Sequence, residues 1–303
     1  MTHTPPRPSV RLVSHTQFPA ETLAHIWWTA KYTTPVPPVE EIHQKMIEDQ
    51  DYREEVENLF TEIIEMLLPC SRFVNFVFAI ENVPISLREQ LVRHKIGMEY
   101  WIQGARVTDM SDIYDNHKYR IPERIQNNPE AAKKYRQTFQ TIQEAYKDLI
   151  AEGFLFEEAR ELLPSGATHR LSFVCNIESL HNMISKRTGW LLQGELWFPI
   201  IKGIVDELES KVSPPFRAFA HPPEISLQGE YRGYKFKDLA YDRYVGITKL
   251  PVDPIFYYKE KEYIEKRSGA PIKSIETLRE EGLWDDQRVA DYINFWGFDP
   301  SKI

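Results

Sequence analysis

Residues 87–106 read LREQLVRHKIGMEYWIQGAR, and the other elements are interpreted outward from this stretch. Its first half has the apolar spacing of an amphipathic helix. We expect that helix to end in the basic run Arg93, His94 and Lys95, after which Gly97 and an aromatic-rich extended segment follow. Donors gathered at the end of an element suit phosphate or another anion better than they suit a core. The stretch therefore predicts an anion-binding site at the end of a helix.

The segments on either side show strand and helix patterns in turn. Residues 74–80 alternate apolar and other side chains, which predicts a strand. Pro84 then opens the helix that we expect to reach Lys95, and residues 98–107 are expected to return as a second strand. The other expected elements are helices at 20–32, 128–152, 156–163, 176–187 and 190–211, two helices within 39–68, and a strand at 168–175.

Two changes in composition suggest how the chain is divided. The proline-rich start suggests an N-terminal arm over residues 1–19, extended or poorly ordered, on a main domain of residues 1–215. After Pro214 and Pro215 the chain becomes rich in Tyr and Phe. We interpret residues 216–303 as a C-terminal extension packed on the main domain, with helices near 255–267 and 273–294.

Charge and motif content exclude several classes of function. A net charge of −8 and a pI near 5.7 argue against nucleic-acid binding. The sequence has no apolar run of membrane-spanning length, no glycine-rich phosphate loop and no metal-binding motif. Cys70 and Cys175 are too few for a disulfide framework, and their apolar neighbours favour buried structural thiols. We expect a cytoplasmic protein that contacts neither membrane nor nucleic acid.

Two segments together resemble a known family. REQLVRHK at 88–95, with Gln90 three residues before Arg93, resembles the motif R-H-R-x-x-S-x-N-E-x-S-x-R-Y of the flavin-dependent thymidylate synthases. EEARELLPSGATHRLSFVCNIESLHNMISKRTGWLLQGEL at 157–196 is similar to that family's second conserved segment, without gaps from Arg160 to Glu195. The resemblance covers roughly residues 66–205, and two matches in the right order are more specific than one.

The resemblance implies a fold and a reaction. It implies an α+β fold in which an antiparallel sheet packs with long helices, here followed by a C-terminal extension. Enzymes of this family methylate C5 of dUMP, taking a methylene group from methylenetetrahydrofolate and a hydride from FAD that NADPH reduces. The partner is thus a pyrimidine deoxynucleotide monophosphate, and no protein cysteine attacks it. The family also implies a homotetramer whose sites are shared between subunits.

The resemblance also assigns roles to individual residues. Arg187 matches the arginine that polarises the pyrimidine, and a guanidinium suits this task because it stays charged and offers a planar donor fork. The substrate-binding positions that match are Gln90, Gly104, Arg106, Arg160 and Arg187, and we add Gln103, which stands where the motif has its second Ser. The flavin-binding positions that match are Ser71, Arg93, His94, Lys95, Asn176 and Asn182, with Lys95 in place of an arginine.

The sequence departs from the family where the base and the flavin would lie. Tyr100 and Trp101 replace the Asn and Glu of the first motif, and Arg106 matches its final Arg only after one inserted residue. Glu178 stands where a flavin-side Arg is common, and Leu191 replaces a His. Tyr100 and Trp101 could stack on a ring, and Gln103 could donate to or accept from a base.

These departures leave three hypotheses. The first is a divergent thymidylate synthase acting on dUMP. The second is a sibling enzyme that methylates or hydroxymethylates C5 of dCMP or dUMP. The third is a non-catalytic paralogue that only binds nucleotides.

Overall fold

The structure is a computed structural model that describes residues 7–187, 194–212, 274–280, 282, 284, 286, 287 and 290. The chain forms two compact units. The first comprises Met1–Met183 and Phe198–Ala218, and the second comprises Ile184–Trp197 and Phe219–Ile303. The domain boundary expected near residue 215 lies outside the described residues. The helix expected near 255–267 and most of that expected at 273–294 also lie outside them, although α12 (Ile275–Glu280) is described.

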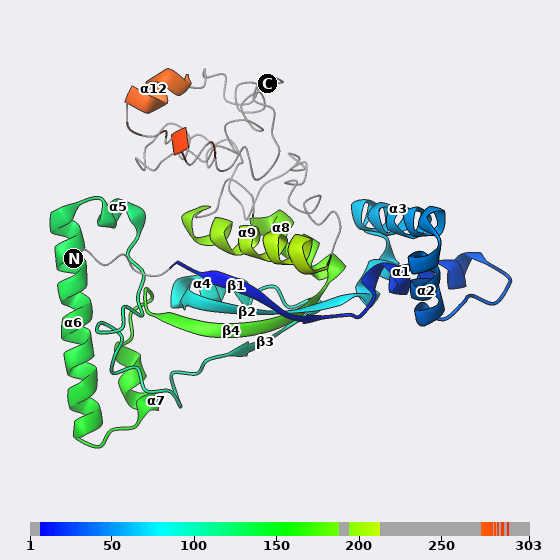
Figure 1. Ribbon diagram of the computed structural model, residues 1–303. Helices are drawn as coiled ribbons and strands as arrows, with labels where there is room; N and C mark the ends of the chain where they lie inside the picture. Colours follow the sequence, from blue (N-terminus) through cyan, green and yellow to red (C-terminus); the bar gives the residue numbers. More distant parts are fainter. Residues whose placement is uncertain are drawn as a thin grey trace, which may run out of the picture. The chain divides into compact units, whose positions relative to one another are not determined.

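A four-stranded antiparallel sheet forms the centre of the first unit (Figure 1). Its strands are β1 (Ser9–His15), β2 (Asn75–Pro84), β3 (Met98–Ile102) and β4 (Thr168–Asn176), in the order β1-β2-β4-β3. Part of the N-terminal segment that we expected to be an extended or poorly ordered arm is therefore an edge strand. It pairs with β2 from Ser9 opposite Glu81 to His15 opposite Phe76.

One face of this sheet is buried under α9 (Gly194–Lys211), with α8 (Ile177–Arg187) on the same side (Figure 1). Gly203 of α9 comes so close to the sheet that a Cβ at this position would lie 2.9 Å from Cβ of Val10. The covered face is aromatic, and the rings of Phe78 and Phe173 stack at 5.3 Å between centroids. Strand alternation brings these apolar side chains to one face.

The opposite face is not covered by any described helix. Val174 is 36% exposed there, and Trp101 is 86% exposed. Trp101 pairs with Ser172, whose other neighbour is Ala79. An open face with an exposed tryptophan is typical of a surface that another protein surface covers.

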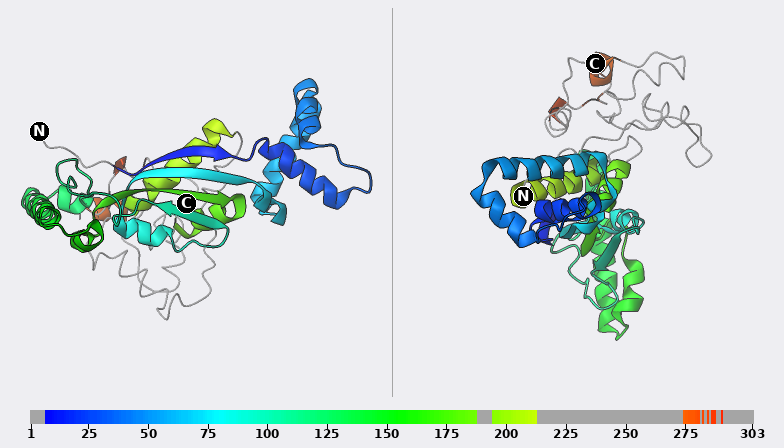
Figure 2. Two further views of the ribbon diagram at one scale, coloured as in Figure 1. Left: turned by 90° about the horizontal axis from the view of Figure 1, so that it is seen from below. Right: turned by 90° about the vertical axis from the view of Figure 1, so that its right-hand side faces the viewer.

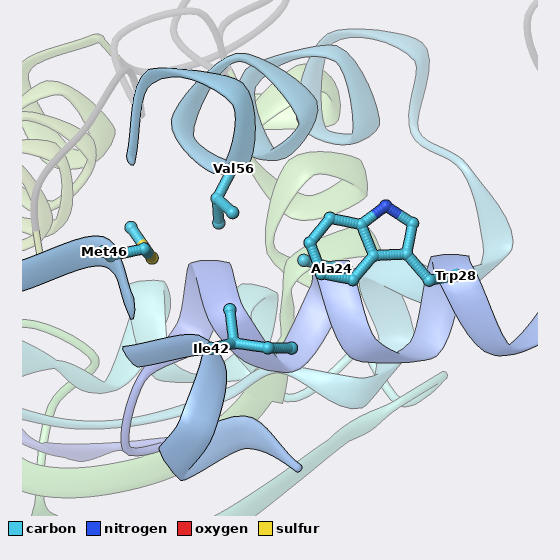
Figure 3. Close-up of a cluster of buried hydrophobic side chains, with 5 residues drawn as sticks. All are labelled: Ala24, Trp28, Ile42, Met46 and Val56. Carbon is cyan, nitrogen blue, oxygen red and sulfur yellow. The ribbon is translucent and has the colours of Figure 1, made fainter. Parts of the chain in front are cut away.

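Three helices form a separate core beyond one end of the sheet (Figures 1 and 2). They are α1 (Pro19–Lys31), α2 (Val39–Glu48) and α3 (Gln50–Met66), as the sequence predicted. Ala24 and Trp28 of α1 face Ile42 and Met46 of α2 and Val56 of α3 (Figure 3).

The helix in the opening stretch is shorter than expected. α4 spans Ile85–Leu91, so the prediction that it reaches Lys95 is wrong. The hydroxyl of Tyr100 lies within hydrogen-bond distance of two carbonyl oxygens, those of Leu91 (2.8 Å) and His94 (3.0 Å), and its one proton is shared between them. The backbone N–H of His94 also donates to the carbonyl of Leu91 (3.0 Å), so residues 92–97 form a turn in place of a further helical turn.

A further group of helices lies beyond the other end of the sheet (Figure 1). They are α5 (Glu123–Gln126), α6 (Pro129–Ala151), α7 (Phe156–Ala159) and the short 3-10 helix η2 (Arg160–Leu162). The side chain of Asn128 accepts from the backbone N–H of Ala131, which confirms the predicted helix start. The α+β fold, with an antiparallel sheet and long helices, is confirmed.

Candidate functional site

One candidate site lies where β4 passes into α8, which we call the β4–α8 corner. Asn176, the last residue of β4, pairs with Asn75 at the start of β2, and Cys175 pairs with Met98 at the start of β3. The side chain of Asn176 accepts from the backbone N–H of Ser179 at 2.8 Å, which confirms its predicted role as a helix cap. The two conserved segments therefore meet at this corner.

The turn of the opening stretch passes very close to the start of α8. Gly97 has φ +67°, a conformation that glycine adopts without a steric cost. A Cβ on Gly97 would lie 2.9 Å from Nδ2 of Asn176 and would also clash with Oγ of Ser179. The basic run Arg93, His94 and Lys95 precedes this contact directly, so the corner holds donors from both segments.

A 3-10 helix, η1 (Pro69–Phe73), completes the corner. Ser71 is fully buried, and its Oγ has no hydrogen-bond partner among the described residues. The neighbouring Arg72 donates through Nε and Nη2 to the carboxylate of Glu178, the second bond being 2.9 Å long. This pair raises the pKa of Arg72 and lowers the pKa of Glu178.

The flavin-binding positions that the sequence proposed are thus mostly gathered at one corner. Arg93 and Lys95 are exposed and His94 is half-buried, all in the turn and not in a helix. Asn182 is half-buried on α8, one turn after Glu178. The corner offers cations, amides and an unsatisfied buried hydroxyl within one small region.

A second group of candidate residues surrounds α7, which we call the α7 cluster. Arg106 pairs with the carboxylate of Glu157, with Nε and Oε2 2.5 Å apart. Nε of Arg160 donates to the carbonyl oxygen of Glu157 at 3.2 Å. Two arginines from the two segments therefore meet at one residue, a suitable arrangement for binding a phosphate.

Gln103 lies next to this cluster and is fixed on both sides. Its side-chain oxygen accepts from the backbone N–H of Arg170 at 3.1 Å. Its carbonyl oxygen accepts from Nδ1 of His169 at 3.3 Å. Among the described residues, the side-chain amide nitrogen of Gln103 is left to donate. Gly104 follows in a turn in which its carbonyl oxygen accepts from the backbone N–H groups of Val107 and Thr108.

His169 is a buried histidine that the sequence did not single out. It is 2% exposed, and its Nε2 has no hydrogen-bond partner among the described residues. Burial lowers its pKa to about 4, and the nearby positive charge of Arg88 adds to this effect. His169 is therefore neutral near pH 7, with Nδ1 protonated to donate to Gln103 and Nε2 bare.

The β4–α8 corner and the α7 cluster lie at opposite ends of β3. The chain is extended from Gly97 to Gln103, which corresponds to roughly 20 Å at ~3.3 Å per residue. Gln90 is half-buried on α4, three residues before Arg93 in sequence. Within the first unit, the flavin positions and most nucleotide positions are thus separate.

Arg187 ends α8 and belongs to the second unit. Its guanidinium carbon lies 4.8 Å from the centroid of the Trp197 ring, a cation–π contact. Leu191 falls in residues 188–193, outside the described part of the chain, as do most residues of the second unit.

Neither thiol is activated. Cys175 is buried in β4 and Cys70 is half-buried in η1, and burial raises the pKa of both. Among the described residues, no three His, Cys, Asp or Glu side chains gather as metal ligands do. None of the described helices has the length and apolarity needed to cross a membrane.

The sequence missed two partnerships that the structure contains. Arg72 follows Ser71, which was predicted to bind the flavin, but no sequence pattern links Arg72 to Glu178 as its partner. Arg88 and His169 come together only because α4 packs near the start of β4. The side chain of Tyr100, considered as a stacking residue, is bound to backbone carbonyls, whereas Trp101 is exposed.

Comparisons with known proteins agree on one family. Residues 11–196 match the sequence model of the family described as "Thymidylate synthase complementing protein" (Thy1). A flavin-dependent thymidylate synthase of Thermococcus onnurineus is 25% identical over 203 residues, which cover 62% of this chain and 75% of that protein. One of Nitratidesulfovibrio vulgaris is 30% identical over 131 residues, covering 41% and 51%.

A solved structure shares the fold. The UMP/dUMP methylase PolB of Streptomyces cacaoi, bound with 5-Br dUMP, superposes with a TM-score of 0.52 at 14% identity, over 69% of this chain and 92% of that one. The family match spans well over half of the sequence and includes both conserved segments. The chain is therefore a divergent member of the Thy1 family, the flavin-dependent thymidylate synthases.

Proposed function

We propose that this protein is a flavin-dependent enzyme that transfers a one-carbon group to C5 of a pyrimidine deoxynucleotide monophosphate, with dUMP as substrate and dTMP as product. The observation that carries the proposal is the contact of Gly97 with Asn176 and Ser179. It joins the two family segments at one corner, and the cations and amides gathered there fit a flavin dinucleotide.

The residues fit the cofactor in two specific ways. The buried Oγ of Ser71 lacks a partner among the described residues, as expected of a group that bonds a ligand. The absence of a Cβ at Gly97 leaves the backbone close to α8, where Asn176 and Asn182 present amides. FAD bound here would supply the hydride, and NADPH and methylenetetrahydrofolate are the proposed co-substrates.

On this proposal the protein binds and polarises the nucleotide. Arg106 and Arg160 would hold the phosphate, while Gln103, fixed by His169 and Arg170, presents its amide N–H to the base. Arg187 would stabilise negative charge developing on the uracil ring, because a guanidinium stays charged at every relevant pH. Neither cysteine takes part, in agreement with their raised pKa values.

Activity assays test this function directly. The purified protein is expected to be yellow and to release FAD on denaturation. Incubation of dUMP with methylenetetrahydrofolate and NADPH should give a product heavier by one methyl group. A protein that neither contains nor takes up FAD would refute the enzyme proposal and favour a nucleotide-binding paralogue.

The runner-up is a sibling enzyme that acts on dCMP or adds a hydroxymethyl group. Two observations favour keeping it. Tyr100 replaces a polar motif residue and turns its hydroxyl to backbone carbonyls, and Trp101 replaces the motif's acid on the exposed face. Turnover of dCMP alone, or a hydroxymethyl mass, would select this reading over thymidylate synthesis.

We further propose that the protein is a homotetramer whose sites are shared between subunits. The flavin positions and the α7 cluster lie roughly 20 Å apart along β3, so a complete site would combine one corner with the α7 cluster of another copy. The exposed sheet face around Trp101 is a suitable contact surface.

Two inactive variants, Arg160→Ala and Asn176→Ala, should regain part of the activity when unfolded and refolded together. If the two variants assemble into one oligomer and still show no activity, the proposal that sites are shared between subunits is refuted.

A further inference from the structure

We propose that Arg72, held in place by Glu178, is a cofactor-binding residue whose guanidinium contacts an acceptor oxygen of the flavin. This inference rests on the proposed function and extends it to a residue to which neither the sequence nor the family segments assign a role. The evidence is the geometry of η1 against the start of α8.

The first step is the orientation of the guanidinium. Glu178 accepts from Nε and from Nη2 of Arg72, so one edge of the planar fork is fixed. An arginine has five N–H donors, and this pair uses two of them. The three remaining donors, two on Nη1 and one on Nη2, face away from the carboxylate. The side chain of Arg72 is 61% exposed, so a ligand can reach them.

The second step is what surrounds the pair. Ser71, the residue before Arg72, is fully buried and its Oγ lacks a partner among the described residues. Asn176 lies two residues before Glu178 and contacts the turn at Gly97. A hydroxyl, an amide and an oriented guanidinium thus meet at one place, and each of them is a donor to oxygen.

The third step is that the ion pair does little for folding. Exposed ion pairs contribute little to stability because water and salt screen them. A cation that is held bidentately at the surface, beside an unsatisfied buried hydroxyl, is therefore better explained by ligand binding. The family commonly has a flavin-side arginine at position 178, where this chain has Glu178. The ion pair places the guanidinium of Arg72 beside that position.

The test compares FAD affinity in three variants of the full-length protein, measured by quenching of flavin fluorescence. Arg72→Ala should weaken FAD binding roughly tenfold, the loss expected for one charge-assisted hydrogen bond. The double variant Arg72→Ala/Glu178→Arg returns a guanidinium to the same place and should recover most of that loss. Lys202→Ala breaks an exposed ion pair with Asp206 on α9 and is the matched control, expected to bind as the wild type does.

The outcomes separate this inference from the proposed function. A wild-type protein that does not bind FAD overturns both. A wild-type protein that binds FAD, together with an Arg72→Ala variant of equal affinity, overturns the inference alone. A double variant as weak as Arg72→Ala would also overturn it, because the charge at this place would then not matter.

Riboflavin identifies the oxygen that Arg72 contacts. Riboflavin carries the ring but no phosphate. If Arg72→Ala weakens the binding of riboflavin and of FAD equally, the contact is to a ring carbonyl. If it weakens the binding of FAD alone, the contact is to the diphosphate.

Unfolding midpoints of the apo variants should match that of the wild type, because the ion pair is exposed.

Discussion

Acidification should destabilise this protein through His169. The pKa of His169 is about 4 in the folded state, against 6.5 for an unperturbed histidine, because the ring is buried and lies near Arg88. The unfolded state therefore binds a proton more readily, and stability falls as pH drops below 6.5. From about pH 7.5 to about pH 5 the loss is about 2 kcal/mol, and it approaches about 3 kcal/mol below the folded pKa. Above about pH 7.5 the ring is neutral in both states and the effect vanishes.

Urea denaturation at about pH 7.5 and about pH 5 measures this loss. In His169→Gln, whose amide does not titrate, the difference between the two pH values should shrink by about 2 kcal/mol relative to the wild type. His15→Gln, at the end of β1, controls for the removal of a histidine as such. In NMR spectra the ring protons of His169 should not titrate between these pH values. Equal acid losses in wild type and His169→Gln, or a His169 titration near pH 6.5, would refute the argument.

Three further substitutions test the packing that positions the candidate site. Gly97→Ala should lower the free energy of unfolding by about 1–3 kcal/mol, because its Cβ would crowd Asn176 and Ser179; it should also weaken FAD binding, and normal stability would contradict the close contact. Phe173→Ala should cost about 3–5 kcal/mol by opening a cavity, seen as a lower urea midpoint at nearly constant m; a cost below 1 kcal/mol would mean that the sheet face is not packed. Asn128→Ala should cost about 1 kcal/mol through loss of the α6 cap, whereas Asn128→Gly should cost only a few tenths; equal costs for both would argue against a capping role.

The uncovered sheet face bears on how the proposed enzyme would assemble. The covered face buries stacked rings under α9, so the fold of one chain already uses that side. The other side leaves Trp101 and Val174 to solvent. A surface of this kind, together with candidate residues at both ends of β3, fits an enzyme whose catalytic site is completed by another copy.

Much of the fold followed from local sequence signals. The alternation at residues 74–80 predicted β2, although the strand continues to Pro84 because its pairing with β4 extends that far. Asn128 and Asn176 were identified as caps because a short polar side chain before a helix satisfies free backbone N–H groups. The limits of α6 followed from its cap and from Gly153, and the two helices within 39–68 followed from the helical spacing of apolar residues.

The end of α4 and the pairing of β1 with β2 depend on contacts between segments that are distant in the sequence, which local sequence patterns do not predict. The helix of the opening stretch stops at Leu91, where the carbonyl accepts from the backbone N–H of His94 and from the hydroxyl of Tyr100 on β3. The N-terminal segment forms β1 by pairing with β2, and the alternation of Val10, Arg11 and Leu12 is a strand pattern that the expectation of an arm overlooked.

The candidate site shows the same division. The two family segments and their candidate donor residues followed from the resemblance of the sequence to the family's motifs. That Gly97 meets Ser179, and that Arg72 reaches Glu178, depends on the register of β3 against β4 and of β4 against β2. The register of two strands depends on many residue pairs between them, so it cannot be predicted from one segment alone. The sequence by itself thus indicated the family and the candidate donor residues, and only the tertiary structure gathered these candidates into a corner and a cluster at opposite ends of one strand.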